Sequence, residues 1–159
     1  MRLIIVRHGK AAHDSPDGTD FARPLRGRGV RQAAYLGERF GETAPRVTRI
    51  IASRAERARH TASIIGDALG VPVEHDDALL VDEPVGPVVE QLASWMTPGG
   101  GALVVVGHNP QLERLASVLG SGPTAPVTPL RTGEAVVIDL DPDNPTAGRE
   151  IERIRLEES

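Results

Sequence analysis

The feature that most constrains the fold is an alternation of short apolar runs with longer helical stretches. Three runs rich in β-branched residues predict fully buried strands, at Leu3–Val6, Val47–Ala52 and Ala102–Val106. Each run is followed by a polar or glycine-containing turn and then by helical periodicity, over Gly29–Phe40, Arg54–Leu69 and Pro110–Leu119. This order predicts an α/β fold, a three-layer α/β/α sandwich with a mostly parallel sheet.

Weaker patterns complete the expected fold. A fourth helix is expected over Val85–Met96 and a short strand over Val71–Glu74. Near the end of the chain, Glu134–Leu140 and Ile151–Leu156 alternate in polarity around the turn Asp141–Pro145, which predicts an antiparallel hairpin on the sheet edge. Loops are expected at Ala12–Arg26 and Gly120–Gly133. The first is long for a connection, so we expect it to cover a site. Residues 1–159 are expected to form one domain.

Composition excludes several functional classes. The chain has no cysteine and a formal net charge of −4, so disulfides, thiolate chemistry and a protein-wide basic field for nucleic acid are absent. The only N-terminal apolar run, Leu3–Val6, is too short for a signal-peptide core or a membrane span. We therefore expect a cytoplasmic protein, a monomer that binds neither nucleic acid nor membrane.

Charged side chains gather where the predicted strands end. The first strand runs into Arg7-His8-Gly9, the second into Ser53 ahead of Arg54 and Arg57, and the third into Gly107-His108-Asn109. Ligands of such sheets bind beyond the carboxyl ends of the strands. Two histidines and several arginines at one edge suggest phosphoryl transfer, because a guanidinium suits the oxygens of a phosphate.

The arginines after Ser53 oppose the expected stability of a helix. Ser53 and Glu56 have the spacing of a capping box, which predicts a helix beginning at Arg54. A cation in the first turn opposes the helix dipole by about 0.3–1 kcal/mol. Arginines at 54, 57 and 59 make sense if an anion binds there. The alternative is that they are solvated and pair with nearby acids, Glu56, Glu38 or Glu42.

Two of the five histidines have an unusual position. His8 and His108 each follow an apolar strand directly and sit beside a glycine, which lets a ligand approach closely. Asn109-Pro110 is a plausible N-cap and first-turn proline, which would put His108 just ahead of a helix. No metal-ligand spacing occurs among the histidines, and we expect neither a metal nor a cofactor.

These motifs together resemble the histidine phosphatase superfamily, with its phosphoglycerate-mutase-like fold. The matching residues are Arg7-His8-Gly9, Ser53-x-x-x-Arg57-Ala58-x-x-Thr61 and Gly107-His108-Asn109-Pro110, in order and spacing. The segment Asp20-x-x-Arg23-Pro24-Leu25-x-x-x-Gly29 and the compact length are similar to the SixA-type phosphohistidine phosphatases within it. One departure is Arg54, which replaces the proline of the commoner SPxxRAxxT motif and puts the rim of the site in doubt.

The resemblance implies a role for each core residue. His8 is the nucleophile that forms a transient phosphohistidine, Arg7 and Arg57 clamp the non-bridging oxygens, and His108 stabilises charge during transfer. Gly9, Asn109 and Arg23 are expected to bind substrate. Phosphoryl transfer needs chiefly positioning and cationic stabilisation, which guanidiniums supply without a metal.

A general acid is hard to place in this sequence. Asp82 and Glu83, after the DALLV segment, are the nearest candidates, and the alternative is that they lie in a solvated loop. Phosphohistidine needs an acid far less than a phosphoester does, so the leading hypothesis is a phosphatase for phosphohistidine of a protein partner. A phosphatase of a small phosphorylated metabolite and a phosphate-binding module without turnover are the alternatives.

Overall fold

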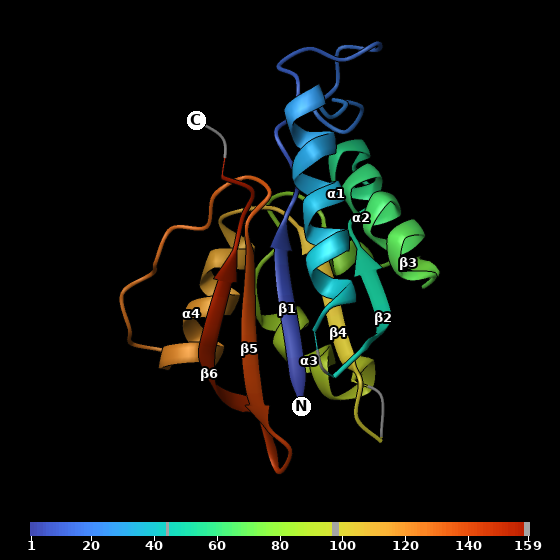
Figure 1. Ribbon diagram of the computed structural model, residues 1–159. Coiled ribbons are helices and arrows are strands. Elements are labelled where there is room, and N and C mark those ends of the chain that lie inside the picture. The colour runs from blue at the N-terminus through green and yellow to red at the C-terminus, as the bar shows by residue number, and fades with distance from the viewer. Residues whose placement is uncertain (44, 97–98, 158–159) are drawn as a thin grey trace.

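A six-stranded sheet forms the centre of the computed structural model, which describes residues 1–43, 45–96 and 99–157 (Figure 1). The strands lie in the order β3-β2-β4-β1-β5-β6. Their bounds are β1 Arg2–Arg7, β2 Val47–Ala52, β3 Val73–His75, β4 Ala102–Gly107, β5 Ala135–Asp141 and β6 Asn144–Ile154. The first four in sequence pair in parallel, whereas β5 runs antiparallel to both β1 and β6. The predicted mostly parallel sheet with a C-terminal hairpin is confirmed.

Helices cover both faces of the sheet, which makes three layers. Helices α1 (Gly27–Gly41) and α2 (Glu56–Leu69) lie on one face, and α3 (Gly86–Trp95) and α4 (Gln111–Ser121) on the other (Figure 1). Alternate residues of β1 serve the two faces: Leu3 and Ile5 pack with α3 and α4, while Ile4 and Val6 pack with α1 and α2. A strand buried on both faces reads as a continuous apolar run, as observed here.

The C-terminal hairpin is tighter than the sequence suggests. Asp141 pairs with Asn144, so two residues make the turn, and β6 begins seven residues before the predicted start at Ile151. The Asp141 side chain accepts a hydrogen bond from the amide of Asp143 at 2.9 Å. Such a bond lets an aspartate close a turn over its own backbone, which removes the need for a longer loop.

Two predicted helix caps are wrong. Helix α2 begins at Glu56 with Ala55 as N-cap, and the amide of Glu56 donates to the carbonyl of Phe21 and not to Ser53, so the capping box does not form. Helix α4 begins at Gln111 with Pro110 as N-cap, so Asn109 does not cap it either. Both side chains are used elsewhere. None of the helices in the described part of the chain is long and apolar enough to cross a membrane.

Candidate active site

The carboxyl ends of the parallel strands surround a pocket of about 340 Å³. Its lining includes Arg7, His8, Asp20, Arg57, His108 and Asn109. The sheet ladder continues one residue past the strand ends, because the amide of His8 donates to the carbonyl of Gly107 at 3.1 Å and the amide of Ser53 donates to Val106 at 3.0 Å. Three distant segments are thereby held at fixed spacing by backbone hydrogen bonds.

His8 is buried and uncharged at neutral pH. The residue is only 6% exposed, and its Nδ1 is 2.7 Å from the carbonyl oxygen of Gly9. A carbonyl only accepts, so Nδ1 carries the proton and Nε2 keeps its lone pair. Burial lowers the pKa of His8 to about 4; the Gly9 carbonyl opposes this effect, and the charges of Arg57, Arg7 and Arg23 add to it. The ring is therefore in the form that can attack an electrophile.

His108 faces His8 from the end of β4. The two ring centroids are 5.3 Å apart with the planes inclined at 54°. Burial, followed by the charges of His8 and Arg57, lowers the pKa of His108 to about 3. Its Nε2 lies 2.9 Å from the Ser53 hydroxyl, while its Nδ1 is buried without a partner in the described part of the chain.

Arg57 comes from the second position of α2 and is almost fully buried. Its Nη2 contacts the Asp20 carboxylate at 2.9 Å and its Nη1 donates to the Asp20 carbonyl at 2.8 Å. Thr61, one turn later, donates its hydroxyl to the Arg57 carbonyl at 2.7 Å and accepts the amide of Gly9 at 3.1 Å. Thr61 thus ties the first strand end to the helix that carries Arg57.

Arg7 and Asn109 share one backbone acceptor on the opposite side of the pocket. Arg7 Nη1 donates to the carbonyl of Leu130 at 3.1 Å, and Asn109 Nδ2 donates to the same oxygen at 2.7 Å. Asn109 Nδ2 also contacts the Glu113 carboxylate at 3.1 Å. Burial lowers the pKa of Arg7, and the charge of Glu113 opposes this effect. The segment around Leu130 therefore fixes both side chains.

Gly9 is not among the residues that line the pocket, and it packs closely against α1. A Cβ on Gly9 would lie 2.6 Å from the carbonyl oxygen of Gly29 in α1, and a Cβ on Gly29 would overlap the carbonyl of Lys10. Two glycines therefore let the backbone of α1 pack directly against the first strand end. The amide of Gly9 is also occupied, because it bonds to Thr61.

The other predicted residues divide between the pocket and the surface. Arg23 lines the pocket, as expected. Asp82 and Glu83, the candidate general acids, are exposed and do not line it; the preceding residue, Val81, does. Asp82 takes a left-handed backbone conformation with φ of 66°.

Only one of the three arginines after Ser53 faces the pocket. Arg54 pairs with Asp77 at 2.6 Å and Arg59 pairs with Glu56 at 2.7 Å, both at the surface. Arg54 and Arg59 therefore pair with acids at the surface, as the alternative reading expects. The partner of Arg59, Glu56, is one of the acids named there. Of these three arginines, Arg57 is therefore the one placed where an anion in the pocket could meet it.

Sequence reasoning did not single out three residues that shape the site. Asp20 binds Arg57 and Arg23, Ser53 binds His108, and Thr61 binds Gly9 and Arg57. All three stand within the motifs quoted above, but a motif gives no partner for a residue. The bonds Asp20–Arg57, Thr61–Gly9 and Ser53–His108 join residues that are 37 to 55 positions apart in the sequence. Only the fold brings those partners together.

Three polar atoms of residues that line the pocket lack a hydrogen-bond partner. The Nε atoms of Arg7 and Arg57 and the Nδ1 atom of His108 are buried without a hydrogen-bond partner in the part of the chain that the structure describes. A buried polar group without a partner costs free energy, so the protein alone does not fully satisfy these residues. Two guanidiniums beside a neutral imidazole favour an oxyanion, and a phosphoryl group in particular.

This fold, with two histidines and two arginines at the carboxyl edge of its sheet, is that of a family of phosphatases. Residues 3–80 match the model of the histidine phosphatase superfamily (branch 1). The chain is 36% identical to an uncharacterized protein of Mycobacterium tuberculosis over 73% of its own length and 70% of that protein. The chain belongs to the histidine phosphatase superfamily.

The similarity extends to phosphatases of two kinds. Phosphohistidine phosphatase SixA of Escherichia coli is 27% identical over 87% of this chain and 86% of its own length. A structure of the protein histidine phosphatase SixA with tungstate has a TM-score of 0.85 at 25% identity, and covers 98% of this chain and 97% of its own. Mycobacterial glucosyl-3-phosphoglycerate phosphatase shares the fold at a TM-score of 0.69 and 20% identity, covering 94% and 96%.

Proposed function

We propose that this phosphatase removes the phosphoryl group from phosphohistidine of a partner protein, with His8 as the nucleophile. This proposal rests on the acidic residues of the pocket: among the described residues that line it, Asp20 is the only carboxylate. Burial raises the pKa of Asp20, but the hydrogen bonds and charges of Arg57 and Arg23 outweigh it, so the pKa is lowered overall. Asp20 is therefore ionised and a poor proton donor.

The lack of a proton donor matters differently for the two kinds of substrate. An alkoxide leaving group has a conjugate acid with a pKa near that of water, about 15.7, and needs an acid to leave. The imidazole of a phosphohistidine, when protonated on its other nitrogen, leaves as a neutral ring whose own pKa is near 6.5. A pocket whose carboxylate is ionised therefore suits phosphohistidine, which is a phosphoramidate, better than a phosphate ester.

The reaction then has two transfers. Nε2 of His8 attacks phosphorus, and the bond from phosphorus to the substrate imidazole breaks as the new bond forms. Arg7 and Arg57 hold the equatorial oxygens, and His108 stabilises the charge of the group in transfer. Water next attacks the phosphorus of phospho-His8. The bond between phosphorus and Nε2 of His8 then breaks, which returns neutral His8. Inorganic phosphate leaves, and the water proton stays on it or passes to solvent.

A trapping experiment tests this function. The protein is mixed with a protein phosphorylated on histidine, and the release of phosphate and the acid-labile phosphoenzyme are measured. The wild type should give both, and the His8→Ala variant neither. His75→Ala is the matched control, because His75 is an exposed histidine at the end of β3, outside the pocket. An active His8→Ala variant would overturn the mechanism.

A small phosphorylated metabolite is the second candidate substrate. Mycobacterial glucosyl-3-phosphoglycerate phosphatase supports it through the shared fold, and so does a further recess of about 550 Å³ beside the pocket. The values of kcat/KM on a histidine-phosphorylated protein and on a panel of sugar and nucleotide phosphates separate the two. Tight phosphate binding with no turnover of either would instead indicate a binding module.

A further inference from the structure

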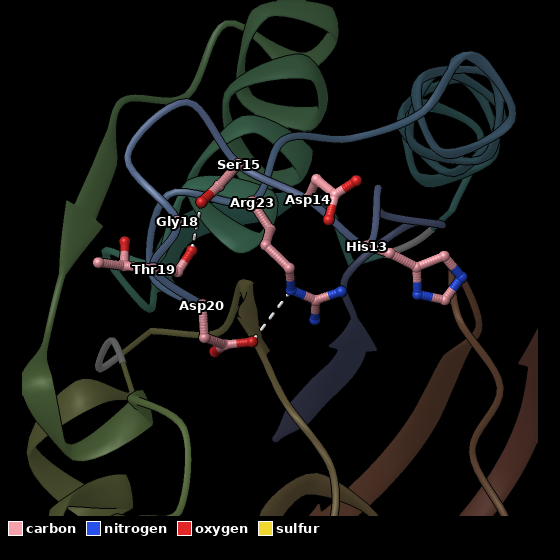
Figure 2. Close-up of a pocket in the computed structure, with 7 residues that line it drawn as sticks. All are labelled: His13, Asp14, Ser15, Gly18, Thr19, Asp20 and Arg23. Atoms are coloured by element: carbon pink, nitrogen blue, oxygen red, sulfur yellow. Dashed lines mark hydrogen bonds and ion pairs between the residues drawn. The ribbon is translucent and has the colours of Figure 1, made fainter.

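The loop between β1 and α1 brings a carboxylate over the pocket. Its base is closed by two backbone bonds of 2.8 Å, from the amide of Ala12 to Pro24 and from the amide of Arg26 to Lys10. Its outer part forms the recess beside the pocket, and Figure 2 shows the Arg23 guanidinium reaching across to Asp20 there. His13, Asp20 and Arg23 line both cavities, so the recess adjoins the pocket.

The Asp20 carboxylate is bound as an oxyanion would be. One oxygen accepts from Nε of Arg23 at 3.0 Å, and the other accepts from Nη2 of Arg57 at 2.9 Å. Both terminal nitrogens of Arg57 bind Asp20, because Nη1 donates to the backbone carbonyl of the same aspartate, while Nε has no partner among the described residues. A phosphoryl group that takes the place of the carboxylate on Nη2 must therefore compete with Asp20 for it.

The two partners differ in their freedom to move. The side chain of Asp20 is 56% exposed, whereas that of Arg57 is 4% exposed and is held at the start of α2. Water can replace the arginines as partner of the Asp20 carboxylate at low cost, but Arg57 cannot leave without burying an unpaired charge or breaking the packing around it. If one of the two yields its place, it is Asp20.

We propose that Asp20 is a positioning residue that occupies Arg57 in the empty pocket and is displaced when a phosphoryl group binds. This role rests on the proposed function, since it requires Arg57 to bind the phosphoryl group. Asp20 thereby keeps a buried guanidinium paired between turnovers and sets the affinity of the pocket for phosphate. Once displaced, the carboxylate stays near the pocket entrance, where it also repels the phosphate product.

The opposite role is that Asp20 only holds Arg57 in place for the substrate, and it predicts the opposite result. The change Asp20→Asn removes the negative charge but leaves the backbone carbonyl that Arg57 Nη1 uses. If Asp20 competes with phosphate, the variant binds phosphate more tightly. If Asp20 only supports Arg57, the variant binds phosphate more weakly.

The test is the dissociation constant of inorganic phosphate, measured by calorimetry on the full chain at pH 7. We expect Asp20→Asn to bind phosphate about three- to tenfold more tightly than the wild type, the effect of removing one half-exposed ion pair and a like charge. Asp20→Glu should return toward the wild-type value because it restores the competing charge. In kinetics, KM for a histidine-phosphorylated protein should fall for Asp20→Asn by a similar factor.

Asp14→Asn is the matched control. Asp14 lies on the same loop and in the same recess (Figure 2), and in the described structure its side chain has no hydrogen bond. It should leave the phosphate affinity within about twofold, the size of a screened surface charge. Equal tightening in Asp14→Asn, or weaker or unchanged binding in Asp20→Asn, would overturn the role of Asp20. A wild type that binds no phosphate would contradict the proposed function itself, and the role of Asp20 with it.

Discussion

Nε2 of His108 lies 2.9 Å from the hydroxyl oxygen of Ser53, which joins the ends of β4 and β2. The same hydroxyl oxygen accepts the amide of Ala55 at 3.2 Å. The Ser53 hydroxyl donates to Nε2 when the ring proton is on Nδ1, and accepts from Nε2 in the other tautomer. In both cases Ser53 fixes the orientation of the His108 ring in the pocket.

Replacing Ser53 with alanine should therefore lower kcat more than it lowers stability. Without the hydroxyl the His108 ring is free to turn or change tautomer, and we expect kcat to fall about ten- to a hundredfold. Loss of the two hydrogen bonds should lower the free energy of unfolding by about 1–2 kcal/mol. Steady-state kinetics and urea unfolding measure the two effects. Ser94→Ala is the control, because Ser94 is exposed and its hydroxyl bonds only locally, to the carbonyl of Gln91 at 2.9 Å.

A comparison of arginines tests which cation serves the pocket. Arg57→Lys keeps the charge but loses the paired N–H donors of the planar guanidinium. It should lower kcat/KM by about a hundredfold or more. Arg54→Lys and Arg59→Lys should stay within about twofold of the wild type, since those side chains pair at the surface with Asp77 and Glu56. Equal losses at all three positions would mean that the whole cluster, and not Arg57 alone, binds the substrate.

The fold was largely predictable from the sequence because its strongest signal is local. Buried strands such as Leu3–Val6 and Ala102–Val106 are continuous apolar runs, and the turns and helices between them require parallel pairing. The errors lie at element ends. Ser53 was expected to cap α2, but its hydroxyl serves His108 and the Ala55 amide instead, and no local pattern reveals that competition.

The site was predictable as a set of residues but not as a set of contacts. His8, Arg57 and His108 were expected together because parallel strands bring their carboxyl ends to one edge. The orientation of each side chain depends on partners far along the chain. Asp20 reaches Arg57 across 37 positions through the long loop, and loops carry little sequence signal about their path. A general acid could not be assigned by order along the chain for the same reason.

Gly9 should matter for packing rather than for substrate. Gly9→Ala places a methyl group 2.6 Å from the carbonyl oxygen of Gly29, where backbone on both sides leaves no room to adjust. We expect the free energy of unfolding to fall by about 2–3 kcal/mol, within the usual cost of overpacking. Gly86→Ala is the matched control: a Cβ there meets nothing within 4 Å, and alanine favours the first position of α3. Thermal unfolding compares the two variants.

The free energy of unfolding should decrease as the pH falls from 7 to 5. The pKa of His8 is about 4 in the folded protein, against about 6.5 in the unfolded chain. Between these values the unfolded chain takes up a proton that the folded protein does not, so stability is fully present above pH 6.5 and is lost toward pH 4. His8 alone should contribute about 2 kcal/mol to the loss between pH 7 and 5, and His108 acts in the same direction. Urea unfolding of the wild type and of His8→Asn at both pH values measures the share of His8.

The pH dependence of activity should show different acidic limbs for the free enzyme and for the enzyme–substrate complex. The nucleophile must be neutral, and the lowered pKa of His8 keeps it so well below pH 6.5 in the free enzyme. We therefore expect kcat/KM, which reports free enzyme, to show no limb from His8 between pH 8 and pH 5. A bound phosphoryl group carries negative charge, which raises the pKa of a neighbouring imidazole, so the acidic limb of kcat should lie at higher pH than that of kcat/KM. Initial rates on a histidine-phosphorylated protein across this range test both statements. A limb in kcat/KM near pH 6.5 that is absent from the titration of the free substrate, and that persists in His75→Ala, would contradict the expectation that the pocket keeps His8 neutral.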